Sequence, residues 1–129
     1  MEPIRKLSGN KLAVGLFGFN CDGGLACSTF PDRWDASWKN CRELAVRADD
    51  AGIDFILPLG RWIGYGGETN HNGSNFESIA WASGLLAVTQ NIMAFGTVHV
   101  TAYPPAVAAK QMVTADHISG GRFGLNIVC

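Results

Sequence analysis

The sequence has few charged residues and no excess of either sign. Charged side chains make up 16% of its 129 residues, and 10 Lys and Arg stand against 11 Asp and Glu, which leaves a net charge of −1. Because binding to nucleic acid or to an anionic membrane surface needs an excess of basic residues, the composition disfavours both partners. No apolar run approaches the ~18 residues of a membrane span, and no signal-peptide cleavage site follows the N-terminus, so we expect a cytoplasmic protein.

The sequence also lacks the standard motifs of metal, nucleotide and hydrolase sites. No two of its cysteines have the C-x2-C spacing of zinc sites and redox dithiols, so we expect reduced, metal-free thiols at Cys21, Cys27, Cys41 and Cys129. The glycine-rich stretch 64–67 has no Gly-Lys-Ser/Thr ending and is not a phosphate loop. The expected pocket has few ionisable groups. A reaction there would therefore depend on the chemistry of an organic cofactor.

A repeated pattern of short apolar strand and amphipathic helix is present. We expect strands at 12–17, 53–59, 92–100 and 122–128, and helices at 35–51, 75–89 and 104–118. We expect Asp35 to cap the first helix, Asp49 and Asp50 to be a solvated helix end, and Gly120 to end the third helix. Repeated βα units whose strands are buried on both faces indicate an α/β fold with a parallel sheet covered by helices.

Two architectures have this order of elements. One is a complete, open four-stranded sheet; the other is the N-terminal half of a (β/α)8 TIM barrel, in which a unit averages ~31 residues. The sequence holds about four units and stops on an apolar strand without a covering helix. We therefore expect residues 1–129 to be a single segment, the N-terminal part of a barrel domain whose remainder is absent.

In either architecture ligands bind at the carboxyl ends of the strands, and these ends should converge on one mouth. Asn126 is an amide inside a buried strand and needs partners, which a ligand or the backbone must supply. Thr97 is either only a β-branched strand residue or a residue whose hydroxyl lies at the strand ends beside the Asn126 amide. His99 is either a ligand contact or a hydrogen-bonded histidine of the core. Arg61 either grips an anion or is a solvated loop charge.

Several stretches resemble the bacterial luciferase-like family of flavin-dependent monooxygenases, over about 11–129. The most specific is the pattern Ser-Gly-Gly-Arg-Phe-Gly-x-Asn-x-Val within 116–128, and weaker ones lie at 48–57, 64–67, 75–78 and 104–110. Within the family, the sequence is most similar to the pyrimidine, dimethylsulfone and alkanesulfonate monooxygenase branch.

The resemblance implies a (β/α)8 barrel that forms a homo-oligomer. It implies that the protein uses reduced FMN from a separate flavin reductase and O2 to oxygenate a small sulfur- or nitrogen-containing substrate. It implies flavin contacts at Gly60, Arg61 and Asn126, and an oxygen pocket formed by Leu57, Thr97 and Asn126, of which Thr97 and Asn126 are the catalytic candidates. We count His99 as a further cofactor contact. Two alternatives stay open: a non-catalytic barrel that binds flavin or deazaflavin, and an open-sheet interaction module.

Overall fold

The computed structural model describes residues 12–129 and contains the predicted alternation of strands and helices. Its strands are β1 (Gly15–Phe17), β2 (Phe55–Leu57), β3 (Met93–His99) and β4 (Phe123–Val128), and its helices are α1 (Trp38–Asp50), α2 (Ser78–Val88) and α3 (Pro105–Ser119). The strands pair in parallel in the order β1-β2-β3-β4, with Thr97 opposite Asn126. The prediction of an α/β fold with a parallel sheet is confirmed.

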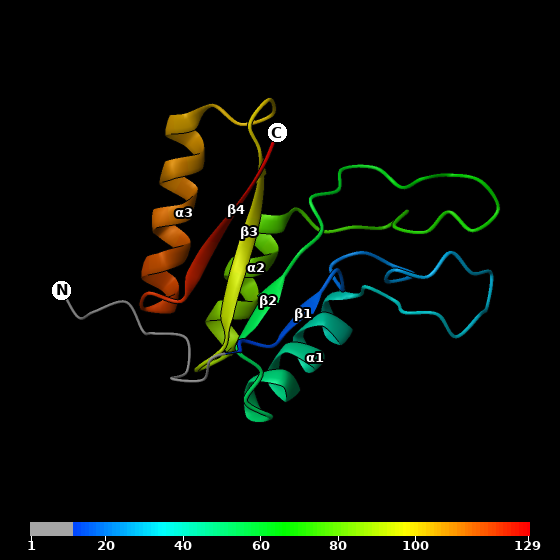
Figure 1. Ribbon diagram of the computed structural model, residues 1–129, viewed down its shortest axis with the longest axis horizontal. Coiled ribbons are helices and arrows are strands. Elements are labelled where there is room, and N and C mark those ends of the chain that lie inside the picture. The colour runs from blue at the N-terminus through cyan, green and yellow to red at the C-terminus, as the bar shows by residue number, and fades with distance from the viewer. Residues whose placement is uncertain (1–11) are drawn as a thin grey trace.

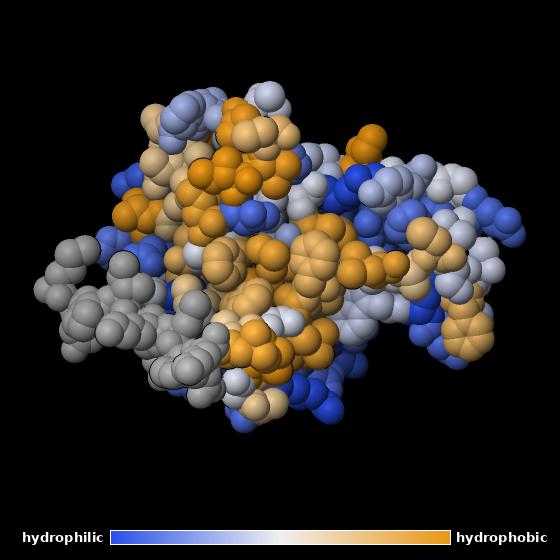
Figure 2. All heavy atoms as spheres, viewed as in Figure 1, coloured by the Kyte–Doolittle hydropathy of each residue, from blue (hydrophilic) through white to orange (hydrophobic). Residues whose placement is uncertain are grey.

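The three helices cover one face of the sheet (Figure 1). The core lies between them and the strands, where Ile56 and Ala94 pack against Leu85 and Leu86. Apolar side chains also gather on the opposite face of the sheet (Figure 2). There the rings of Phe55 and Phe95 meet edge to face, with centroids 5.8 Å apart.

Glycines on the neighbouring strands make room for these two rings. A Cβ at Gly15 would lie 2.3 Å from the ring of Phe55, and one at Gly124 would lie 2.5 Å from the ring of Phe95. Both distances are far inside van der Waals contact, so the two phenyl rings occupy the space that side chains on β1 and β4 would otherwise take. The two rings form an apolar layer on this face, just before the carboxyl ends of the strands.

The helix ends follow the prediction with one correction. Gly120 ends α3 in the left-handed conformation, with a φ of 65°, as expected. The cap of α1 is Ser37 and not Asp35, because the Ser37 hydroxyl accepts the hydrogen bond from the backbone N–H of Asn40. Asp35 instead accepts a hydrogen bond from the side-chain amide of Asn40.

Asp49 corrects a second expectation, because its side chain is buried and not solvated. Its carboxylate accepts hydrogen bonds from the backbone N–H groups of Gln90, Asn91 and Ile92, at the turn that leads into β3. Burial alone would raise the pKa of the Asp49 carboxyl, but these hydrogen bonds outweigh it and hold the pKa below its ordinary value. The carboxylate therefore holds the turn before β3, at the edge of the sheet opposite the carboxyl ends of the strands.

Two long loops extend side by side beyond the carboxyl ends of β1 and β2 (Figure 1). We call residues 20–34 and 60–75 together the loop arm. Cys21 and Asn75 form an antiparallel bridge, and the backbone N–H of Asp22 donates to the carbonyl of Ser74 at 2.9 Å. Arg33 adds a hydrogen bond from its guanidinium to the carbonyl of Thr69. The two loops of the arm are therefore ordered by contacts with each other.

All four cysteines are free thiols, two of them buried and two exposed. Within residues 12–129 no group of three or more His, Cys, Asp or Glu side chains could hold a metal ion. In the same part of the chain, no helix has the length and apolar character that crossing a bilayer requires.

Candidate functional site

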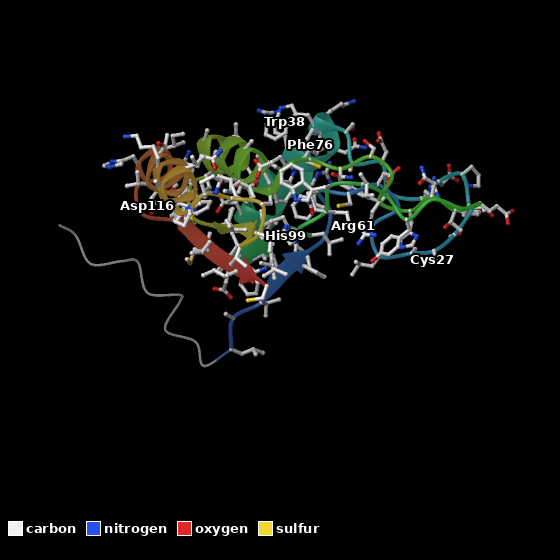
Figure 3. The ribbon with its side chains drawn as sticks, turned by 90° about the horizontal axis from the view of Figure 1, so that it is seen from above. Cys27, Trp38, Arg61, Phe76, His99 and Asp116 are labelled. Atoms are coloured by element: carbon white, nitrogen blue, oxygen red, sulfur yellow. The ribbon has the colours of Figure 1, made fainter. Side chains whose placement is uncertain are left out.

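The carboxyl ends of the strands bring most of the predicted site residues together. Gly60, Arg61, Thr97 and His99 line one small pocket, and Figure 3 shows His99 at the end of β3 with Arg61 beyond it toward the loop arm. The same pocket is also lined by Trp62, Glu77, Ser78 and Tyr103. Asn126 does not line it but forms a hydrogen bond with Thr97, which does. Leu57 is half-buried at the end of β2.

Thr97 is held from three sides. Only 2% of its surface is exposed, and its hydroxyl donates to the carbonyl of Pro58 at 3.1 Å. Ser78 donates its hydroxyl to the Thr97 carbonyl at 2.6 Å and accepts from the Thr97 N–H at 3.2 Å. Because its only hydroxyl proton is used by Pro58, Thr97 can offer other groups just a lone pair.

Asn126 uses that lone pair. Its Nδ2 donates to the Thr97 hydroxyl oxygen at 3.2 Å. Within residues 12–129 this is the one hydrogen bond of the Asn126 side chain, so its second N–H and its Oδ1 are both available. Thr97 therefore orients an amide that presents a donor and an acceptor next to each other at the mouth.

Gly60 allows the loop after β2 to pass directly against β3. A Cβ at this position would lie 2.6 Å from Cγ2 of Thr97 and 2.7 Å from Cε1 of His99. Both distances are too short for carbon atoms in contact. The glycine thus keeps the backbone close to the Thr97 and His99 side chains.

Sequence reasoning missed the hydrogen bonds that fix the rim of the pocket. Glu77 caps α2, accepting from the N–H groups of Ile79 and Ala80, and it also accepts from the Tyr103 hydroxyl at 2.7 Å. Burial raises the pKa of Tyr103, and the hydrogen bond and charge of Glu77 raise it further, so the phenol keeps its proton. The Tyr103 ring contacts that of Trp62, with centroids 6.0 Å apart.

Asn20 is a second residue whose role was missed. It is fully buried, donates from Nδ2 to the carbonyls of Leu59 at 2.9 Å and Phe76 at 3.4 Å, and accepts from the Leu59 N–H at 2.8 Å. Its side chain therefore joins the segments that follow β1 and β2 to the start of α2. An asparagine directly after a strand and a glycine turn is the sequence signal that could have indicated it.

The donor and acceptor groups of the mouth fit a planar heteroaromatic ring. The free amide edge of Asn126 can pair with a ring edge that alternates carbonyl and N–H groups. The Phe55 and Phe95 rings supply an apolar floor below. These features match an isoalloxazine ring, which has both an apolar end and a polar end, so the residues fit a flavin.

Comparison with known proteins identifies a family. The family described as luciferase-like monooxygenase matches residues 17–129. A pyrimidine monooxygenase RutA from Rhizobium rhizogenes is 36% identical over 117 residues, which are 91% of this chain and 32% of that protein. The chain therefore spans about a third of the length of the curated relatives it matches.

Solved structures show the same arrangement of strands and helices. Riboflavin lyase (RcaE), determined with modified FMN and riboflavin, has a TM-score of 0.72 and 26% identity, over 92% of this chain and 30% of that one. DmoA from Hyphomicrobium sulfonivorans has a TM-score of 0.74 at 17% identity, over 92% of this chain and 28% of that one. The second likeness concerns the fold alone.

Proposed function

The chain belongs to the luciferase-like monooxygenase family and shares its arrangement of parallel strands and helices, and we propose that it carries the flavin-ring and oxygen side of a two-component monooxygenase site. The proposed cofactor is reduced FMN delivered by a separate flavin reductase. The proposed co-substrate is O2, and the second substrate is a small organic molecule containing nitrogen or sulfur.

The observation that carries this proposal is the Thr97–Asn126 pair at the mouth. An amide held by a buried hydroxyl, with its second N–H and its carbonyl free, is a preorganised contact for the polar edge of a flavin ring. Gly60 and Arg61 line the pocket next to Thr97. Among the relatives, the riboflavin lyase structure contains a modified FMN.

When bound, reduced FMN would supply the electrons that activate O2. The residues of this chain would hold the ring, keep water away and control protons. Asn126 would orient the polar edge, while the apolar layer of Phe55 and Phe95 would exclude water from below. Because the Thr97 hydroxyl donates its hydrogen bond to the Pro58 carbonyl, it would not serve as a proton donor to a group bound at the mouth.

The first experiment is an anaerobic titration of the intact protein with reduced FMN. We expect saturable binding, and we expect Asn126→Ala to weaken it about ten-fold, the loss of one or two hydrogen bonds. Gln111→Ala, an exposed change on α3, is the matched control and should leave the affinity unchanged. If the intact protein did not bind reduced FMN, we would abandon the proposal.

A second measurement separates catalysis from binding alone. Oxygen consumption is compared with incorporation of labelled oxygen into candidate substrates, starting with pyrimidines because the similar curated relatives are pyrimidine monooxygenases. A monooxygenase gives labelled product, whereas a barrel that only binds flavin or deazaflavin consumes oxygen and gives hydrogen peroxide alone.

A further inference from the structure

Four side chains of the loop arm form a stack that ends on Arg61. The guanidinium carbon of Arg61 lies 3.4 Å from the ring centroid of Tyr65. The Tyr65 ring lies on the His71 ring, with centroids 4.3 Å apart and planes 11° apart. Cys27, from the other loop, contacts the same imidazole (Figure 3 shows Cys27 and Arg61). We call Cys27, His71, Tyr65 and Arg61 the Arg61 stack.

The geometry of Cys27 makes it a packing contact of the stack. Its sulfur lies 3.6 Å from Nδ1 and 3.5 Å from Nε2 of His71. A sulfur in line with one ring nitrogen would lie much farther from the other, so nearly equal distances place it over the ring. The first loop of the arm therefore holds the imidazole in place, and through Tyr65 it restrains Arg61.

Arg61 brings a positive charge to the mouth that no acidic group of the described chain neutralises. Its Nε donates to the carbonyl of Ile63 at 3.0 Å, and the one ion pair within residues 12–129 joins Arg47 to Glu43 elsewhere. Glu77 lines the same pocket, but its oxygens accept from the N-terminus of α2 and from Tyr103. The remaining guanidinium N–H groups of Arg61 are open to a ligand.

The face of the guanidinium is covered by Tyr65, whereas its edge, which carries the N–H groups, is not. A planar fork presented edge-on is the geometry that binds two oxygens of one anion. We propose that the Arg61 stack is a built receptor for an anionic oxygen-bearing group at the mouth, with Arg61 as the binding residue and Tyr65 and His71 as positioning residues.

The occupant is a carboxylate or sulfonate on the organic substrate, so the inference rests on the proposed function. Anion binding in the absence of flavin tests it separately from flavin binding.

The test uses calorimetric titration of the intact, flavin-free protein with methanesulfonate and with acetate, at constant ionic strength. We expect saturable binding that Arg61→Gln weakens about ten-fold or more. Tyr65→Ala should weaken it about two- to five-fold, because it removes the ring that holds the guanidinium. Tyr65→Phe keeps the ring and should bind like the wild type, as should Ile63→Ala, an exposed neighbour whose contact with Arg61 is through its backbone.

A double-mutant cycle distinguishes positioning from a general effect on the loop. If Tyr65 acts through Arg61, Tyr65→Ala has no further effect on anion affinity in the Arg61→Gln background. An equal effect of Tyr65→Ala in both backgrounds would overturn the positioning role.

The same titrations with reduced FMN present, under anaerobic conditions, separate the receptor from the flavin site. Independent binding of the anion and the flavin supports the receptor, whereas mutual exclusion overturns it, because Arg61 would then be a flavin contact. If neither anion binds, the receptor proposal is wrong, and binding of reduced FMN still tests the proposed function on its own.

Discussion

Replacement of the Thr97 hydroxyl is the sharpest test of the site. Thr97→Val removes the oxygen but keeps the branched shape, whereas Thr97→Ser keeps the oxygen and removes a methyl group. In the wild type this one oxygen donates to Pro58 at 3.1 Å and accepts from Asn126 at 3.2 Å. The pair of variants therefore separates hydrogen bonding from packing at a single position.

The structure sets the expected loss of stability. Thr97→Val leaves the carbonyl of the buried Pro58 without its donor, and an unsatisfied buried group of this kind costs about 1–3 kcal/mol. We therefore expect the free energy of unfolding to fall by about 2 kcal/mol for Thr97→Val. For Thr97→Ser we expect a loss of about 1 kcal/mol, the value of one buried methyl group. Urea denaturation measures both.

The functional expectation concerns coupling, the product formed per flavin oxidised. Without the Thr97 oxygen, the Asn126 amide loses the contact that orients it, and coupling should fall about five-fold, the equivalent of one hydrogen bond. Thr97→Ser should couple like the wild type. If Thr97→Val couples normally while it is less stable, or if Thr97→Ser couples as poorly as Thr97→Val, the hydroxyl does not orient the site.

Two further predictions concern groups outside the mouth. Asp49→Asn should lower the free energy of unfolding by about 2–4 kcal/mol at pH 7, because an amide cannot accept all of the backbone N–H bonds that Asp49 accepts. Since the folded state lowers the pKa of this carboxyl, its contribution is present above the ordinary value of about 4 and is lost as the pH falls through the folded-state pKa. Denaturation at pH 7 and pH 3 should therefore show a smaller difference between variant and wild type at pH 3, and an equal difference would contradict the role. Iodoacetamide should alkylate exposed before buried thiols in mass spectra, because burial raises the pKa of Cys21 to about 11 and also raises that of Cys41. The exposed thiols are Cys27 and Cys129. Faster labelling of the buried thiols would contradict their burial.

The order of strands and helices could be predicted because each element has its own local spacing of apolar residues. The site residues on strands could be predicted for a related reason, since Thr97 and Asn126 are polar residues within apolar runs. Other roles depend on contacts that no periodic pattern reports. Asp49 looks like a solvated helix end because its hydrogen-bond donors begin 41 residues later, on the turn before β3. The contact of Glu77 with Tyr103, 26 residues away, likewise exists only after folding.

The loop arm differs from the sheet beneath it in how it can move. Several of its apolar side chains are already in solvent, with Leu25, Phe30 and Tyr65 each at least 60% exposed. Opening the outer part of the arm would therefore expose little further apolar surface and would break none of the pairing between strands, so that part should form a local unit of low stability. Arg61 belongs to that unit, whereas Thr97 lies in the core. The mouth thus combines an entrance that fluctuates with a floor that only global unfolding disturbs.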